Sequence, residues 1–405
     1  MSGFPLESLV LEGSTRIVLL VMDGVGDLPD PEHGGRTPLS AARTPHLDAL
    51  TPRAALGLLQ PVAAGITPSS GPGHLALFGY DPVATQVGRG VLEALGAGIE
   101  LKDGDVAARA NFCTVDARGT VTDRRAGRIA GEQSARLVEA LARDLPKIGD
   151  VEVLLKAGKG HRFVVVLRGA GLAGAVSDAD PHKEGHPIPA ARALAEDPAA
   201  MRTATIVNTF VAKAAERLRG EKAANAVLLR GLSARPALPG YRERFRLRAA
   251  AIAAYPMYRG VAELAGMQVF PVGERATDAF AAAGERFSEF DFFFIHVKGT
   301  DVAGEDGNFD AKVAVIEEVD RALPALLALS PDVLCVTGDH STPVSVRGHS
   351  WHPVPLLVHG RWCGADHAPR FHEASCRTGS LGVLASRDLM AVLLANAGRL
   401  DKFGA

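Results

Sequence analysis

The chain is poor in aromatic residues, which make up 5% of its 405 residues. Aromatic side chains are the platforms on which the bases of single-stranded nucleic acids stack. The formal net charge of −2 also provides no general field for a polyanion, although local basic clusters can still meet a small anion. Nucleic acid is therefore not an expected partner.

Cysteine is scarce as well, and its four positions lie far apart: Cys113, Cys335, Cys363 and Cys376. They form no C-x-x-C pair, and a disulfide scaffold is not expected in so long a chain. Free thiols favour a reducing, cytoplasmic compartment. The N-terminal residues lack the basic segment and apolar run of a signal peptide. No stretch approaches 18 consecutive apolar residues, so no membrane span is expected.

What the chain does contain is enough apolar sequence for a large core. Apolar residues make up 47% and charged residues 22%, and the length suggests two or three folding units. Continuous apolar runs at 16–22, 290–297, 332–337 and 354–358 are typical of strands buried on both faces, as in a parallel sheet. Helical patterns alternate with them, for example at 311–329 and 387–397. This alternation predicts a doubly wound α/β core.

The middle of the chain has a different texture. Residues 110–222 carry shorter strand patterns, at 152–155 and 163–167, and two long amphipathic helices, near 131–142 and 200–218. We interpret this segment as a smaller α+β domain inserted into the core. The core would then consist of residues 1–109 and 223–405, with the chain returning to it at 226–230 and 248–254.

Acidic and imidazole side chains follow or precede the core strands, and they are Asp23, Asp301, Glu305, Asp339, His340 and His352. Ligands of open α/β sheets bind beyond the carboxyl ends of the strands. A mixed set of oxygen and nitrogen donors suits Mn²⁺, Mg²⁺ or Zn²⁺, and two ions better than one. The alternative is that each aspartate only caps the next helix, but capping does not explain the histidines.

A serine stands before a Gly/Pro turn that opens a helix, in Thr67-Pro-Ser-Ser70-Gly-Pro-Gly-His74. Such a hydroxyl lies at a helix N-terminus, where free N–H groups favour a phosphate. A bound metal would lower its pKa and make it a nucleophile. The alternative is an ordinary serine N-cap. Ser70 becomes a candidate nucleophile only because metal ligands are expected around it.

The inserted segment holds polar clusters from which we select Arg124, Arg128, His161, Arg162, Asp178 and His182 as candidate substrate-binding residues. Guanidinium groups bind carboxylate and phosphate oxygens in pairs. The clusters would form a lid that captures a small dianion. The alternative is a solvated surface face.

Five segments together resemble the archaeal-type cofactor-independent phosphoglycerate mutases, which belong to the alkaline phosphatase superfamily. They are Val-Met-Asp23-Gly-Val-Gly-Asp, Pro-Ser-Ser70-Gly-Pro-Gly-His-Leu-Ala-Leu-Phe-Gly-Tyr-Asp-Pro, Ser177-Asp-Ala-Asp-Pro-His-Lys-Glu-Gly-His, Lys298-Gly-Thr-Asp301 and Thr337-Gly-Asp339-His340-Ser-Thr-Pro. They span nearly the whole chain in order. The resemblance is most specific in the serine and Asp-His segments and weaker in the inserted domain.

The resemblance implies an alkaline phosphatase-like core with two divalent ions and no 2,3-bisphosphoglycerate. Asp23, Ser70, Asp339 and His340 would bind one ion, and Asp301, residue 305 and His352 the other, with Ser70 as nucleophile. The family shows histidine four residues after the aspartate, whereas this chain has Glu305. A glutamate oxygen shifts the expected preference toward Mn²⁺ or Mg²⁺, with Zn²⁺ and Co²⁺ as further candidates.

The implied activity is the interconversion of 3-phosphoglycerate and 2-phosphoglycerate through a phosphoserine, in glycolysis and gluconeogenesis. The sequence keeps two rivals open. One is another enzyme of the superfamily, a phosphatase, a phosphopentomutase or a nucleotide phosphodiesterase, with the same core and a different lid. The other is a metal-stabilised sugar-phosphate-binding protein without catalysis. The sequence does not indicate an oligomeric state.

Overall fold

The computed structural model describes residues 6–85 and 87–404. The chain divides into two compact units, of which the first comprises Met1–Gln86 and Leu238–Ala405 and the second Val87–Ala237. We describe each unit by itself.

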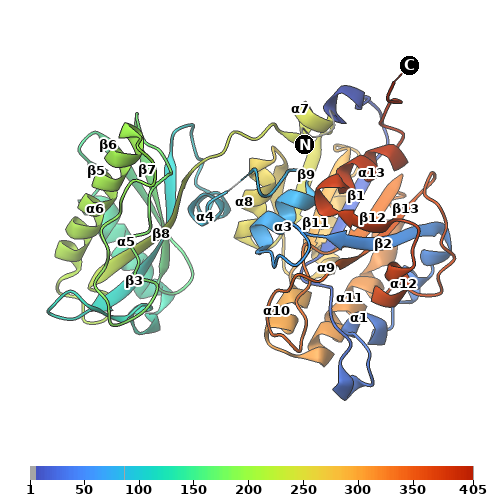
Figure 1. Ribbon diagram of the computed structural model, residues 1–405, viewed down its shortest axis with the longest axis horizontal. Coiled ribbons are helices and arrows are strands. Elements are labelled where there is room, and N and C mark those ends of the chain that lie inside the picture. The colour runs from blue at the N-terminus through green and yellow to red at the C-terminus, as the bar shows by residue number, and fades with distance from the viewer. Residues whose placement is uncertain (1–5, 86, 405) are drawn as a thin grey trace. The chain divides into compact units, whose positions relative to one another are not determined.

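The first unit is built on a mixed sheet of eight strands within the described residues (Figure 1). In their order across the sheet the strands are β10 (Gln268–Pro271), β9 (Ala249–Ala253), β11 (Phe292–Val297), β1 (Ile17–Met22), β12 (Val333–Thr337), β13 (Val354–Gly360), β2 (Ala54–Gln60) and β14 (Gly382–Ala385). Every pair is parallel except the two that β13 forms with its neighbours β12 and β2.

Helices cover both faces of this sheet, as side chains of β11 show. Phe294 packs against Phe78, directly after α3, with ring centroids 4.8 Å apart. The next residue back, Phe293, points to the opposite face and stacks on Phe287, directly after α9, at 5.3 Å. The α-helices of this unit are α1 (Pro38–Ala41), α2 (Pro45–Asp48), α3 (Ser70–Leu77), α7 (Tyr241–Phe245), α8 (Pro256–Leu264), α9 (Ala276–Arg286), α10 (Gly299–Glu305), α11 (Phe309–Leu327), α12 (Glu373–Arg377) and α13 (Leu389–Asn396).

The central strands are buried along their whole length. All six residues of β1 and of β11 and all five of β12 are buried. A strand covered on both faces must be apolar on both, which explains the continuous apolar runs of the sequence. The prediction of a doubly wound, mostly parallel α/β core is confirmed.

The second unit is an antiparallel sheet with helices. Its strands are β3 (Val106–Val115), β4 (Val121–Asp123), β5 (Lys147–Ile148), β6 (Val151–Ala157), β7 (Arg162–Arg168) and β8 (Ala226–Ala234), in the order β4-β3-β7-β6-β5 with β8 paired to β3. Its helices are α4 (Arg89–Gly96), α5 (Gly131–Asp144) and α6 (Pro198–Leu218). One face of the sheet forms an apolar core that includes Phe112, Phe163 and Phe210.

The second unit extends beyond the 110–222 segment expected from the sequence. The run at 226–230, which we expected to return to the core, lies in β8 and pairs with β3 from Ala226↔Cys113 to Ala234↔Val106. An apolar run of this kind fits either sheet, and only its pairing decides between them. Upstream, α4 packs so closely on β3 that a Cβ added at Gly90 would lie 2.3 Å from the Ala107 carbonyl oxygen.

Two features of the first unit position the functional site. The carboxyl ends of β11, β1 and β12 lie at one edge of the sheet because these strands are parallel neighbours. Strand β13 runs the other way, so the residues that precede it reach the same edge. Helix α3 packs onto that edge without a side chain in between, since a Cβ at Gly73 would lie 2.7 Å from the Asp339 carbonyl oxygen.

Among the described residues, no helix is both long and apolar enough to cross a membrane.

Candidate metal and phosphoryl-transfer centre

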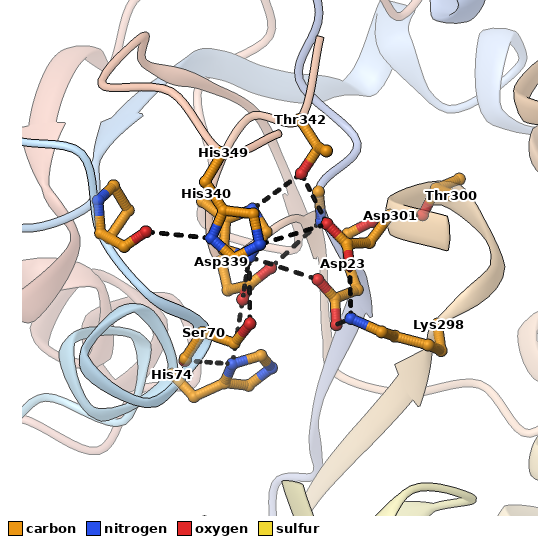
Figure 2. A network of polar contacts seen from close by, with 12 residues as sticks. Asp23, Ser70, His74, Lys298, Thr300, Asp301, Asp339, His340, Thr342 and His349 are labelled. Carbon is orange, nitrogen blue, oxygen red and sulfur yellow. Dashed lines mark hydrogen bonds and ion pairs between the residues drawn. The ribbon is translucent and has the colours of Figure 1, made fainter. Parts of the chain in front are cut away.

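Four of the predicted ligands meet at this edge of the sheet (Figure 2). Asp23 directly follows β1, Asp339 and His340 follow β12, and Ser70 is the first residue of α3. All four are buried, with Ser70 the most exposed at 7%. The structure thus brings together groups that lie up to 317 positions apart in the chain.

The Nε2 atom of His340 is the point around which these groups gather. It lies 3.1 Å from Asp339 Oδ2, 3.5 Å from Asp23 Oδ1 and 3.3 Å from Ser70 Oγ. Neither of these two carboxylate oxygens has a hydrogen-bond partner among the described residues. A buried carboxylate oxygen without a donor is costly, so this arrangement calls for a cation.

The hydrogen bonds on the far side of the His340 ring fix its tautomer. Thr342 donates its hydroxyl proton to Asp301 Oδ1 at 2.6 Å, because a carboxylate only accepts. The same hydroxyl oxygen lies 3.0 Å from His340 Nδ1 and must therefore accept from it. The proton on Nδ1 leaves the lone pair of Nε2 directed at the carboxylates, which is the state of a metal-ligating imidazole.

The residues present therefore fit a divalent cation. Asp23, Asp339 and His340 offer ligand atoms that all lie within 4.8 Å of one another. Two anionic oxygens, one imidazole lone pair and the neighbouring Ser70 hydroxyl form a donor set typical of Mn²⁺ or Zn²⁺.

The surrounding groups offset the negative charge only in part. Burial raises the pKa of Asp23, but the hydrogen bond from His296 (3.0 Å) and the charge of Lys298 (3.0 Å) outweigh it, and that pKa lies well below its ordinary value. For Asp339, burial and the charge of Asp23 raise the pKa, while His340 and His74 lower it to a net value below the ordinary one. Both carboxylates are therefore ionised.

His74 links the serine helix to these carboxylates. It lies one helical turn after Ser70, and its Nδ1 donates to the Ser70 carbonyl oxygen at 2.8 Å. The same nitrogen lies 3.1 Å from Asp339 Oδ2. Burial lowers the pKa of His74, but the charge of Asp339 outweighs it and the net pKa is raised. The residue thus ties the position of the Ser70 backbone to that of Asp339.

A second ligand group consists of Asp301, His340 and His349, whose ligand atoms also lie within 4.8 Å of one another. The His349 ring stacks on His340 with centroids 3.7 Å apart, and its Nδ1 donates to the Pro68 carbonyl oxygen at 3.0 Å. The second nitrogen, Nε2, lies 3.6 Å from Asp301 Oδ1 and 3.8 Å from Glu305 Oε1. The Glu305 side chain is 55% exposed, so this group is open to solvent on one side.

His352 is not part of either group. Its Nδ1 contacts Ser350 Oγ at 3.1 Å and its ring stacks on Trp351. His349 lies three positions earlier in the same turn, and nothing in the sequence alone separates the two histidines.

Lys298 was not predicted as a site residue, although its ammonium bridges Asp23 Oδ2 and Asp301 Oδ2 at 3.0 Å and 2.5 Å. Its position three residues before Asp301, in the Lys-Gly-Thr-Asp segment, could have indicated a role at the same site.

In the second unit, the predicted substrate-binding residues do not form a single cluster of contacts. Arg124 is held by a two-pronged ion pair with the buried Asp180, at 2.7 Å. Arg124 and Arg128 line the same cavity of about 450 Å³. His182 pairs with Asp178 at 3.1 Å.

The sheet face opposite the apolar core of this unit is cationic. Arg109 and Arg230 stand directly opposite each other on β3 and β8, and Arg162 stands opposite Asn111. Burial lowers the pKa of His161, and the charges of Arg162 and Arg109 lower it further. Among the described atoms, Arg109 Nε, Arg230 Nε and Asn111 Oδ1 are buried without a hydrogen-bond partner. The Glu93 carboxylate pairs with Arg109 at 3.1 Å and offsets part of this charge, so the remaining positive charge favours an anion at this face.

The fold and the centre define a class of protein, an α/β protein with a mixed, mostly parallel sheet, a separate antiparallel unit and two candidate metal sites. Comparison with known proteins gives the family. Residues 52–224 match the model of the family described as 2,3-bisphosphoglycerate-independent phosphoglycerate mutase. A probable mutase of this kind from Thermotoga neapolitana is 52% identical over 99% of this chain and 98% of its own length. One from Thermus thermophilus is 51% identical, with both chains covered completely.

Solved structures agree. The cofactor-independent phosphoglycerate mutase of Thermoplasma acidophilum is 33% identical and superposes with a TM-score of 0.76 over 95% of this chain and 100% of its own. A protein from Pyrococcus horikoshii is 31% identical, with a TM-score of 0.82 over 97% and 100%. The chain belongs to the family of archaeal-type 2,3-bisphosphoglycerate-independent phosphoglycerate mutases.

Replacing Asp339 by asparagine tests the charge argument. Asp339→Asn removes one of two neighbouring carboxylate charges, and its amide can donate to the free lone pair of His340. Because the pKa of Asp339 lies below its ordinary value, its charge stabilises the metal-free fold, and we expect the metal-free variant to be less stable than the metal-free wild type. We also expect Mn²⁺ to raise the melting temperature of the wild type but hardly that of the variant.

Thermal unfolding with a chelator and with Mn²⁺ measures both effects. Asp332→Asn is the matched control, because Asp332 lies at the opposite end of β12, where it accepts from the Arg16 amide at 2.7 Å. Equal responses to Mn²⁺ from the wild type and Asp339→Asn would contradict the assignment.

Proposed function

We propose that this chain interconverts 3-phosphoglycerate and 2-phosphoglycerate, with Ser70 carrying the phosphoryl group between the two hydroxyls. The observation that carries the proposal is the place of the Ser70 hydroxyl. It lies at the start of a helix, 3.3 Å from a histidine nitrogen that also faces two carboxylate oxygens without donors. The family membership of the whole chain supports the same substrate.

The proposed reaction has two balanced steps. In the first, Ser70 Oγ loses its proton and forms a bond to phosphorus, while the bond from phosphorus to the substrate hydroxyl oxygen breaks and that oxygen gains a proton. In the second, the other hydroxyl of the bound glycerate loses its proton and its oxygen forms a bond to phosphorus, while the bond from phosphorus to Ser70 Oγ breaks and Oγ regains a proton. Divalent cations bound at the centre would acidify the serine hydroxyl and offset charge on the phosphoryl oxygens.

The two ligand groups would hold two cations. Asp23, Asp339 and His340, with Ser70, are the proposed ligands of one, and Asp301, Glu305 and His349 of the other. His352, which was expected from the sequence, is not among these proposed ligands, because its Nδ1 contacts Ser350 whereas His349 lies beside Asp301. Oxygen donors from Asp301 and Glu305 favour Mn²⁺ or Mg²⁺ at this second position.

The second unit is proposed to bind an anionic group of the substrate. Its cationic sheet face, formed by Arg109, Arg162 and Arg230, includes two guanidinium nitrogens, Arg109 Nε and Arg230 Nε, that lack acceptors within the described chain. Arg124, Arg128 and His161 are further candidates for this role. Guanidinium groups suit the glycerate carboxylate, which both isomers share. Holding that carboxylate keeps the intermediate bound while the glycerate turns, and loss to water would make the enzyme a phosphatase.

The four cysteines form no disulfide within the described chain, and a reducing, cytoplasmic compartment remains the proposed location for this glycolytic activity.

Ser70→Ala tests the covalent step. The variant keeps the carboxylates and the imidazole, so its metal content should stay close to that of the wild type. The isomerisation rate in an enolase-coupled assay should fall by about four orders of magnitude or more. Intact mass spectrometry with substrate should find a phosphoryl adduct on the wild type and none on the variant.

The neighbouring serine provides the control. Ser69 is exposed and its side chain makes no capping hydrogen bond, so Ser69→Ala should leave turnover unchanged. Release of free phosphate in place of isomer would identify a phosphatase. Mn²⁺ binding with neither product nor adduct would leave only a binding protein.

Glu305→His tests the ligand that distinguishes this chain from the family pattern. An imidazole at this position should raise the affinity for Zn²⁺ relative to Mn²⁺ by about tenfold, because nitrogen donors suit Zn²⁺ better. Competitive titration of the metal-stripped protein measures the ratio. Asp306→His, one position further on, is the control. An unchanged ratio would mean that residue 305 is not a ligand.

Arg230→Met tests the cationic face of the second unit. Loss of a charge-assisted hydrogen bond of about 1.5–3 kcal/mol should raise KM for 3-phosphoglycerate roughly tenfold or more, with a smaller change in kcat. Arg202→Met, which removes an exposed ion pair with Asp150 in the same unit, should leave KM unchanged. A KM equal to that of the wild type in Arg230→Met would exclude this face as the anion site.

A further inference from the structure

Behind the candidate centre lies a lysine that the proposed reaction does not use. Lys312 stands in the first turn of α11, and its side chain is 0% exposed. Lysine is almost never buried so completely without a partner, because its ammonium is strongly hydrated in water. The groups that replace this water indicate what the residue does.

Four oxygen atoms surround the Lys312 ammonium. It donates to the carbonyl oxygens of Gly24 at 2.9 Å, of Thr342 at 2.9 Å and of Gly26 at 3.4 Å. The fourth oxygen is Asp27 Oδ2, at 2.8 Å. Three carbonyl oxygens and one carboxylate oxygen around a single positive charge make up the kind of shell that encloses a monovalent cation.

These oxygens belong to two different loops, and both carry proposed ligands. Gly24, Gly26 and Asp27 follow Asp23 in the loop after β1. Thr342 follows His340 in the loop after β12. Direct bonds also join the loops, among them those from the Thr342 amide to the Gly24 and Gly26 carbonyl oxygens at 3.3 Å and 3.1 Å. The Gly24 amide donates to Asp339 Oδ1 at 3.2 Å, and the Val344 amide donates to the Asp27 carboxylate. The ammonium therefore ties together the two segments that hold the ligands of one ion.

The loops approach so closely that the contact leaves no room for adjustment. Gly24 has a φ of +62°, and a Cβ there would lie 2.4 Å from Thr342 Oγ1 and 2.8 Å from Asp301 Oδ1. Carbonyl oxygens that face one another at such a crossing repel. A positive charge between them turns this repulsion into attraction, and a neutral side chain of the same size cannot.

We propose that Lys312 is a positioning residue whose buried ammonium serves as a built-in monovalent cation. It fixes the spacing between the loop of Asp23 and the loop of Asp339 and His340, and it thereby sets the affinity for the divalent ion that these residues bind. The inference rests on the proposed metal site but not on the isomerase activity. Substituting a residue that orients metal ligands without binding the metal itself typically lowers metal affinity by about 10- to 100-fold.

The first experiment compares two buried cations. Lys312→Met keeps the volume of the side chain and removes its charge. Arg399→Met is the matched control, since Arg399 is also buried and donates to carbonyl oxygens of Gly13 and Thr15, away from the proposed ligands. Calorimetric titration of each metal-stripped, full-length variant with Mn²⁺ should show affinity reduced about tenfold or more in Lys312→Met and unchanged in Arg399→Met.

A second readout follows the geometry of the site. The visible absorption of bound Co²⁺ responds to ligand number and arrangement, so it should change in Lys312→Met and stay as in the wild type in Arg399→Met. A general loss of stability would lower the melting temperature of both variants without separating them in this way.

A milder variant covers the case in which Lys312→Met does not fold. Asp27→Asn keeps the shape of the shell and all three carbonyl oxygens while removing its one negative charge. Its Mn²⁺ affinity should fall by a few-fold, about midway between the wild type and Lys312→Met.

The outcomes separate this inference from the proposed function. Mn²⁺ affinity equal to that of the wild type in Asp27→Asn and in folded Lys312→Met would overturn it, as would an equal loss in Arg399→Met. A wild type that binds Mn²⁺ but fails to isomerise phosphoglycerate would overturn only the proposed function.

Discussion

The centre depends on one electrostatic constraint, the neutralisation of carboxylate charge where water is absent. Asp23 and Asp339 face the same histidine nitrogen, and neither shared oxygen finds a donor within the described chain. The metal-free chain offsets this charge with groups on the outer side of the carboxylates, such as Lys298 and His296. The inner oxygens are left for a cation.

Lys298 and Lys312 are both close to this charge, but they contact different groups. Lys298 touches the carboxylates of Asp23 and Asp301 directly. Lys312 touches none of them and acts on the backbone behind, where three carbonyl oxygens converge. A free monovalent ion at the position of the Lys312 ammonium would be present only in the fraction of molecules that had bound it. A lysine fixed in a helix is present in every molecule and keeps the loops spaced when the site is empty.

Much of this arrangement could be predicted from the sequence, for a reason that lies in sheet geometry. Residues after β1 and β12 meet because parallel neighbours end at one edge, so Asp23, Asp339 and His340 could be grouped from their positions alone. The turn before β13 has no periodicity, so nothing in the sequence ranked His349 above His352. Nor did the apolar run at 226–230 show which sheet it joins, since strand pairing is a long-range property.

The reversed direction of β13 has a consequence for how this centre can change over time. Because that strand starts at the edge where its neighbours end, the site receives one ligand from a connecting turn whose length is not constrained by a crossover helix. Substitutions or insertions at 343–348 can move His349 while β12 and β13 keep their register. The ligands around Ser70 are anchored at strand ends and at the start of a helix, whereas the place of His349 depends on the length of this turn.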